Sequence, residues 1–197
     1  MNASIGGRSV WKVLAAIGTP VAAFLFVGAV VMGTSRAAFF DTTDNSSNSL
    51  TAGDVVISDD DAGSALFSVG NMAPGDTVTK CINVQYDGSI VPAGVDLYVA
   101  DGGLGGTGLG AYLNLTVELG TGGTFADCTG FSGSSVYTGT LAGFAADHTD
   151  FATGTGSWAA SSTGDDRTYR FTLELQDDND AQNLGASVAF TWEAQNQ

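Results

Sequence analysis

Residues 168–175 have the sequence TYRFTLEL, in which polar and apolar side chains alternate strictly. The apolar side chains are at the odd positions, Tyr169, Phe171, Leu173 and Leu175. Successive residues of an extended chain point to opposite faces, so this period of two is the pattern of a β-strand with one buried face. The sequence therefore predicts a strand here whose odd-numbered face belongs to the core.

The same period recurs on both sides of this stretch. It is found in residues 77–86, 112–119 and 188–192, and shorter candidate strands are residues 55–57, 65–69, 95–99 and 136–141. Turn-forming sequences such as Pro74-Gly75-Asp76 separate the runs. Residues 141–151 could hold one short helix. Many short strands without long helices predict an all-β, antiparallel sandwich or barrel with a single domain.

Charge is distributed unevenly along the 197 residues. Three of the six basic residues lie in the first 36 positions, whereas all 21 acidic residues follow from Asp41 onward. A surface with this excess of carboxylates repels nucleic acid and anionic lipid head groups. We therefore expect no nucleic-acid partner, and no membrane partner once the N-terminal segment is removed.

Residues 1–37 have the composition of a secretory signal peptide. Two basic residues precede the apolar run 13–32, and small residues follow it. Cleavage after Ala37 would place small residues at positions −3 and −1, whereas cleavage after Ala38 would place an arginine at −3. The run is also long enough for an uncleaved membrane anchor, but Pro20 and the cleavage site favour a signal peptide. We expect a secreted protein of the cell surface or extracellular matrix.

Cys81 and Cys128 are the only cysteines. In an exported chain an even count favours a disulfide, with free or redox-active thiols as the alternative. The bridge would close a loop of roughly 48 residues and contribute about 4 kcal/mol in the chain-entropy model. Because Cys81 is on the odd face of its strand, opposite Ile82 and Val84, we expect the bridge to lie outside the main core.

The sequence lacks the residue patterns of common hydrolases. His148 is the only histidine, and neither HExxH nor Gly-x-Ser-x-Gly is present. A single histidine cannot build a His-rich zinc centre. The glycine-rich stretch 101–110 has no following helix of the kind a phosphate-binding loop requires, so we expect a flexible loop there. The sequence predicts a protein without enzymatic activity.

Two acidic clusters could supply oxygen ligands to calcium, which is a hard cation. Their members are Asp59, Asp60, Asp61, Asp177, Asp178 and Asp180. Neither cluster has the spacing of an EF-hand loop, and solvated turns are the alternative interpretation. Calcium is the only cofactor that the sequence suggests.

Three blocks of sequence carry recognisable motifs. Gly33–Val56 has an aromatic-Asp pair, a polar stretch and the start of an expected first strand over residues 51–57. Val69–Ser89 contains NMAPGD, a strand and then DGS, and Tyr169–Gln195 is an expected C-terminal hairpin that contains FTWEAQ. In this order the blocks resemble the TasA/camelysin family of exported biofilm-matrix fibre proteins. Residues 100–165 match poorly, and the cysteine pair and the pronounced acidity depart from the family.

The resemblance implies a jelly-roll-like β-sandwich over residues 50–197 that polymerises into fibres. In such fibres the N-terminal segment of one subunit adds as a strand to the next subunit, a contact that is head-to-tail and gives an open filament. The segment here is residues 38–49, and its expected partner-binding residues are Ala38, Phe39, Phe40 and Asp41. The partner is then a second copy of the chain, with other matrix components as further candidates. A frayed terminus is the alternative for this segment.

Two other functions stay open on the sequence alone. Some camelysin relatives are labelled metallopeptidases, although the inventory of residues offers no zinc motif. A monomeric secreted module that binds glycans is the second, because Trp158 and Trp192 could stack on sugar rings. Against it, Trp192 fits the core face of its strand, and Trp158 is in a predicted loop.

Overall fold

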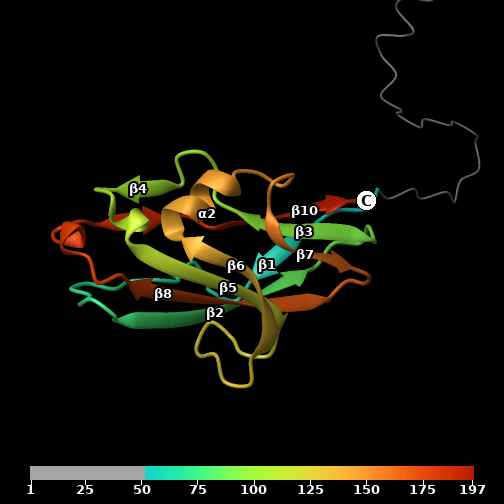
Figure 1. The fold of residues 1–197 in the computed structure, drawn as a ribbon. Helices are drawn as coiled ribbons and strands as arrows, with labels where there is room; N and C mark the ends of the chain where they lie inside the picture. The colour runs from blue at the N-terminus through green and yellow to red at the C-terminus, as the bar shows by residue number, and fades with distance from the viewer. Residues whose placement is uncertain (1–51) are drawn as a thin grey trace, which may run out of the picture. The chain divides into compact units, whose positions relative to one another are not determined.

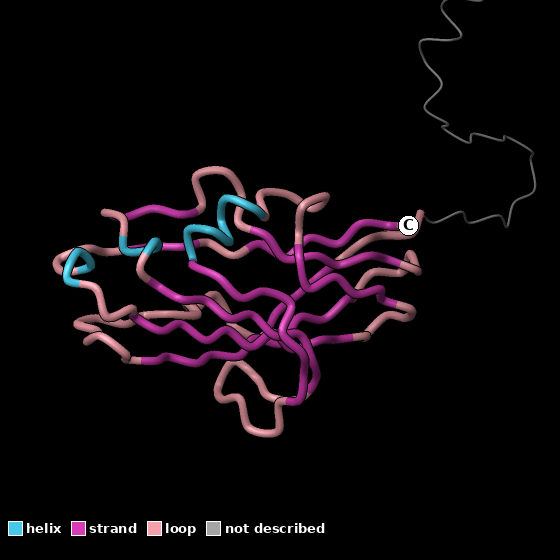
Figure 2. The backbone as a smooth tube through the Cα atoms, in the orientation of Figure 1, coloured by secondary structure: helices cyan, strands magenta, loops and turns pink. Residues whose placement is uncertain are grey.

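A computed structural model describes residues 52–197, so the predicted signal peptide and donor segment lie outside the described residues. In the described part, strands dominate and helix occurs only in short pieces (Figure 2). The elements are β1 Ile57–Asp59, β2 Thr77–Tyr86, β3 Ala93–Tyr98, β4 Leu104–Gly106, η1 Leu109–Ala111, β5 Leu113–Thr121, β6 Ser132–Thr140, α2 Leu141–Asp147, β7 Thr155–Ala160, β8 Asp166–Leu175, η2 Asn179–Ala181, β9 Ala186–Val188 and β10 Thr191–Asn196.

The strands form two main antiparallel sheets that pack as layers (Figure 1). One sheet has five strands in the order β1-β2-β8-β5-β6, and the other has three in the order β10-β3-β7. A further pair is β4 with β9. Strand β8, which contains residues 168–175, is the centre of the larger sheet, with β2 and β5 as its neighbours. The predicted all-β sandwich is confirmed, and the finer jelly-roll order stays a prediction.

The core lies between the layers and is built on the odd-numbered face of β8, as the alternation predicts. Tyr169 and Phe171 have no exposed surface. The ring of Phe171 lies against Phe190 and Trp192, with centroids 4.6 Å and 6.2 Å away. Phe67 makes an edge contact with the same ring at 6.4 Å. Aromatic side chains from two distant stretches of the chain, around residue 67 and at residues 190–192, therefore converge on one residue of the central strand.

The outer face of the five-stranded sheet carries polar contacts and the disulfide. Cys81 and Cys128 are bonded, which confirms the predicted bridge, and Cys81 is not part of the core cluster between the sheets. Arg170 donates two hydrogen bonds to Glu118, at 2.6 Å and 2.7 Å, and its guanidinium lies 4.4 Å from the centre of the Phe131 ring. The bridge therefore lies outside the core, as expected from the odd position of Cys81.

Residues 65–69 form no strand, so the prediction of one there is wrong. Leu66 and Phe67 are neighbours in sequence and both pack against the core cluster. An extended strand would send two successive side chains to opposite faces. The need to bury both side chains against the sandwich explains why this segment is irregular.

The C-terminal region also differs from expectation. The pattern at 188–192 predicted one strand, but β9 ends at Val188 and pairs with β4, whereas β10 begins at Thr191 and pairs with β3. The expected C-terminal hairpin is wrong, because β8 and β10 belong to different sheets. Both edges of β8 are occupied by β2 and β5, so the chain must cross to the other layer before it can pair again.

One expectation about a loop is wrong, and one about a short helix is confirmed. The glycine-rich stretch 101–110 contains β4 and the start of η1, and is therefore not the plain flexible loop expected from its composition. Gly106, at φ 107°, lies so close to the opposite strand that an added Cβ would be 2.3 Å from the carbonyl oxygen of Gly185. The short helix expected within 141–151 is α2, which the Thr140 side chain caps by accepting a bond from the Gly143 amide at 3.0 Å.

Asp96 is a buried carboxyl on β3, 9% exposed, and the Ser157 hydroxyl donates to it. Burial raises the pKa of Asp96, and the hydrogen bond from Ser157 acts in the opposite direction. The folded state therefore holds this proton more tightly than the unfolded chain does. The negative charge at Asp96 costs stability at neutral pH, and that cost disappears as the pH falls below the ordinary pKa of 3.8.

We expect Asp96→Asn to unfold at a higher temperature than the wild type at pH 7, because asparagine keeps an acceptor for Ser157 without the buried charge. The difference should shrink towards zero at about pH 3, where Asp96 is protonated in both states. Thermal melts across this pH range measure it. Asp101→Asn, which removes one negative charge from an exposed turn, is the matched control. A benefit of Asp96→Asn that is equal at all pH values would contradict the burial argument.

Candidate binding groove

Strand β2 has an edge that is only partly paired. β8 pairs with it from Thr77 to Gln85, but β1 covers only Val84–Tyr86 on the other side. The carbonyl oxygen of Asn83 accepts the Asp60 amide at 3.2 Å, so the backbone groups of odd-numbered residues point toward the β1 side. For Thr79 and Cys81, no backbone partner is found on that side among residues 52–197. This is the geometry of a sheet edge that can accept another strand.

The smaller sheet also ends in an edge strand, β10. The backbone amide of Gln197 donates to the carbonyl oxygen of Pro92 at 3.2 Å. The backbone amide and carbonyl groups of odd-numbered residues in β10 therefore point toward β3. The backbone groups of Trp192 and Ala194 consequently point away from β3, toward the side where β1 lies. The two layers thus have incompletely paired edges on the same side of the sandwich.

Three cavities have volumes of about 630, 390 and 290 Å³. Val78 of β2 lines the second, and residues of β1, β2 and β10 line the third. The first two share the lining residues Val69, Met72, Leu109 and Ala186. The second and third share Phe190. Each of these cavities shares lining residues with the next, and we refer to the three together as the open-side groove.

The middle of the open-side groove is apolar. Val78 of β2, Leu173 of β8 and Val188 of β9 line it, and the irregular segment 65–69 lies along it. Val69 is 47% exposed although it is a large apolar side chain. The groove therefore presents apolar surface of both layers to an occupant.

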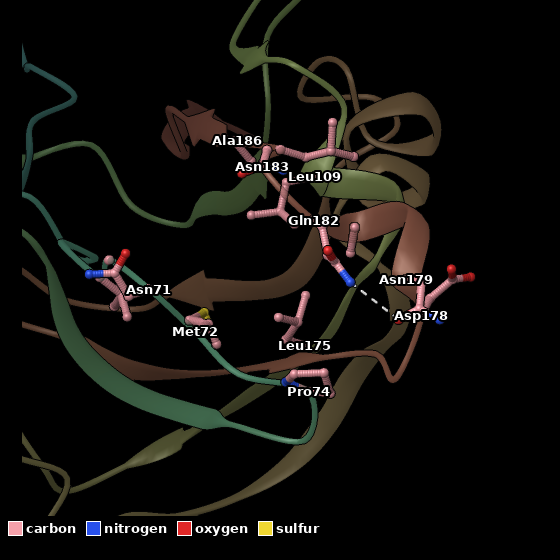
Figure 3. Close-up of a pocket in the computed structure, with 15 residues that line it drawn as sticks. Asn71, Met72, Pro74, Leu109, Leu175, Asp178, Asn179, Gln182, Asn183 and Ala186 are labelled. Carbon is pink, nitrogen blue, oxygen red and sulfur yellow. Dashed lines mark hydrogen bonds between the residues drawn. The ribbon is translucent and has the colours of Figure 1, made fainter.

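One end of the open-side groove combines an apolar base with a rim of carboxamides. Figure 3 shows Met72, Pro74 and Leu175 on one side of this space and Leu109 on the other. The rim carries Asn71, Asn179, Gln182 and Asn183, and the Gln182 amide donates to the Asn179 side-chain oxygen at 3.2 Å. Carboxamides both donate and accept hydrogen bonds, which suits the main chain of a peptide. No Lys, Arg or His lines this end of the groove.

The other end of the groove is acidic and contains the first cluster that the sequence suggested for calcium. Asp59 and Asp61 line it, beside Trp192. The pKa of Asp59 is raised, mainly because its carboxyl is partly buried. The side chain of Asp60 does not line the groove. Its two carboxylate oxygens accept hydrogen bonds from the backbone amides of Asn83 and Phe125, each at 2.8 Å. Its carboxylate thus links β2 to the disulfide loop.

The second acidic cluster lies near the carboxamide end. Asp178 caps η2 by accepting the Asp180 amide at 2.9 Å, and Asp177 is exposed beside it. Within the described residues, no group of three or more His, Cys, Asp or Glu side chains is placed to hold a metal ion. Calcium binding stays a prediction for both clusters.

The remaining residues singled out in the sequence are used for packing. His148 donates a hydrogen bond from Nδ1 to the Thr153 carbonyl oxygen, and its ring contacts Phe144 and Tyr137. Trp158 lies in β7, which corrects its predicted place in a loop, and is only 8% exposed. Trp192 packs on Tyr169 and Phe171 as its position in the alternation indicates. The buried Trp158 ring has no open face for stacking on a sugar, whereas Trp192 is half-buried and lines the third cavity.

A comparison with protein families matches residues 12–100 to the family described as camelysin metallo-endopeptidase. Over residues 12–100 the chain is similar to the camelysin family. The resemblance inferred from the sequence is thereby confirmed. The matched stretch includes the first two motif blocks and the strands β1, β2 and β3, whereas the third block lies outside it. A comparison with curated proteins finds no match.

The description of the camelysin family names a metallo-endopeptidase, and such an enzyme needs side chains that hold a metal ion. A catalytic zinc is typically held by three His, Glu, Asp or Cys side chains. Here both cysteines are in the disulfide, and the single histidine is held by Thr153 and two aromatic rings. The donors in residues 52–197 do not fit such a centre.

Residues 1–51 lie outside the described part, and with them Ala38, Phe39, Phe40 and Asp41, the expected contact to a neighbouring subunit. Within residues 52–197, no helix has both the length and the apolar character needed to span a membrane.

Proposed function

We propose that this chain is an exported, non-enzymatic subunit of an extracellular fibre, in which residues 38–49 of one copy occupy the open-side groove of the next. The observation that carries the proposal is the unpaired edge of β2 beside an apolar groove between the layers. Similarity to the camelysin family over residues 12–100 and the absence of a fitting metal-ligand set in residues 52–197 support the structural role.

The edge of β2 explains how a donor segment would be held. The outward amide and carbonyl groups of Thr79 and Cys81 would each gain a main-chain partner from an added strand. An unpaired edge is also a hazard, since it can pair with any other chain. A dedicated donor segment both satisfies these groups and restricts pairing to copies of the same protein. Because donor and acceptor are different surfaces, the contact repeats without closing and produces a filament.

The apolar groove explains why the donor carries two adjacent phenylalanines. In an added strand, Phe39 and Phe40 point to opposite faces, so only one of them enters the groove. Burying one phenylalanine side chain contributes about 1.5–3 kcal/mol. The other phenylalanine faces outward and contributes less. The two residues therefore have unequal roles in the proposed contact.

The test is electron microscopy of leader-free protein in two lengths, residues 38–197 and residues 50–197. We expect filaments from the longer chain and dispersed particles from the shorter one. Phe39→Ala and Phe40→Ala in the longer chain are matched variants, and one should reduce filaments far more than the other. Equal unfolding midpoints would show that the differences do not arise from misfolding.

Two results would contradict the proposal. Filaments from residues 50–197 would show that assembly does not need the donor segment. Dispersed particles from residues 38–197, at concentrations well above those of the exported protein, would show that the chain is not a fibre subunit.

A further inference from the structure

A three-residue motif on the outer face of the sandwich has no role in the groove. Asn114, Leu115 and Thr116 form the pattern Asn-x-Thr within β5. Leu115 is fully buried in the core. Because side chains alternate along a strand, Asn114 and Thr116 both lie on the outer face. Asn114 is exposed, and Thr116 is half-buried.

The amide of Asn114 is held in a defined orientation. Its side-chain oxygen accepts a hydrogen bond from the Gln176 side chain at 2.8 Å. Its Nδ2 makes no hydrogen bond within the described residues. Asn83 on the same sheet differs, because its Nδ2 donates to Asp166 at 2.6 Å and to Thr168 at 3.2 Å. The Nδ2 atom of Asn114 is therefore not engaged by Gln176, which binds only the side-chain oxygen.

We propose that Asn114 is an attachment site for an N-linked glycan. Asn-x-Ser/Thr is the acceptor pattern for N-glycosylation in exported proteins. The proposal rests on the export predicted from residues 1–37, and it is independent of fibre assembly. Asn114 lies in a strand between β8 and β6, so the transfer takes place on the exported chain before this sheet forms.

The co-reactant is a saccharide carried on a lipid phosphate or pyrophosphate. A bond forms between Nδ2 of Asn114 and the anomeric carbon of the sugar. The bond from that carbon to the phosphate oxygen breaks, and the phosphate leaves with the electron pair. The proton lost from Nδ2 passes to a base of the transferase. No oxidant or reductant is required.

The position is compatible with a bulky attachment. The residues paired with Asn114 on either side are Glu174 of β8 and Thr140 of β6, and Glu174 is exposed. The outer face lies opposite the core face, which lines the groove. A glycan on Asn114 would shield the larger sheet from solvent and leave the groove free for an occupant.

The test is peptide mass spectrometry of the protein exported by its own cells. We expect the peptide that contains Asn114 to be heavier than its sequence mass by the mass of a saccharide. The added mass should be lost completely in Asn114→Gln and in Thr116→Val. It should be retained in Thr116→Ser, which preserves the pattern, and in Gln176→Ala, which removes only the hydrogen bond.

The same pattern occurs at Asn2, within the predicted signal peptide, and at Asn45, both outside the described residues, so the peptides must separate these positions from Asn114. An Asn114 peptide at its plain sequence mass in the wild type overturns the proposal, as does added mass that persists on this peptide in Asn114→Gln. Electron microscopy of Asn114→Gln separates the two proposals, because loss of the glycan should leave filament formation intact.

Discussion

Phe171→Ala should lower the free energy of unfolding by about 3–5 kcal/mol, the usual cost of removing a buried phenylalanine ring. The side chain has no exposed surface and lies on the central strand of the larger sheet. Its ring contacts Phe67 from one part of the chain and Phe190 and Trp192 from another. Single domains are stable by about 5–15 kcal/mol, so this one change should remove a large share of the total. Denaturant unfolding of leader-free protein measures it.

Thr172→Ala is the matched control for this prediction. Thr172 follows Phe171 on the same strand but lies on the outer face, where its hydroxyl is 3.2 Å from that of Thr79. Its loss should cost at most about 1.5 kcal/mol, the upper end for one ordinary hydrogen bond. If the two variants had equal effects, the assignment of the odd-numbered face to the core would be wrong. Phe171→Leu should fall between them, because it keeps part of the apolar volume.

Removal of the disulfide should have a comparable effect, about 4 kcal/mol. Cys81 and Cys128 are 47 residues apart, and a cross-link over this distance removes much of the freedom of the unfolded chain. Cys81→Ala combined with Cys128→Ser tests this by denaturant unfolding under oxidising conditions. We expect a lower midpoint and an unchanged set of strands by circular dichroism, since the bridge lies outside the core cluster.

Wild-type protein unfolded in the presence of a reductant is the control for the two substitutions. Its stability should match that of the double variant, because both lack the cross-link. A double variant as stable as the oxidised wild type would contradict the prediction. It would indicate that other contacts hold the loop, namely the bond from the Phe125 amide to Asp60 and the stacking of Phe131 on Arg170.

The sequence predicted the family resemblance but not the geometry of the candidate site. Motifs in residues 12–100 pointed to the camelysin family, which the family comparison confirms. No sequence pattern pointed to the residues that line the groove. Its walls come from residues as distant as Met72, Leu109 and Leu175, and no local pattern brings these together. The carboxamides at its rim, such as Asn183, look like ordinary turn residues in the sequence.

Local alternation determined which face of each strand is buried, because the two-residue period is a property of the extended backbone itself. From TYRFTLEL it followed that Phe171 points inward and Arg170 outward, and from the position of Cys81 that the disulfide lies outside the core. Both hold in the folded chain. The sequence alone was sufficient here because each inference depends only on neighbouring residues.

Only the tertiary structure decided which strands are neighbours. β8 pairs with β2 and β5 rather than with β10. Residues 65–69 form no strand, because Leu66 and Phe67 both pack against the core. These outcomes depend on hydrogen-bond partners and apolar surfaces supplied by distant parts of the chain. The partly unpaired edge of β2 has the same origin, because an edge is defined by the strand that is missing beside it.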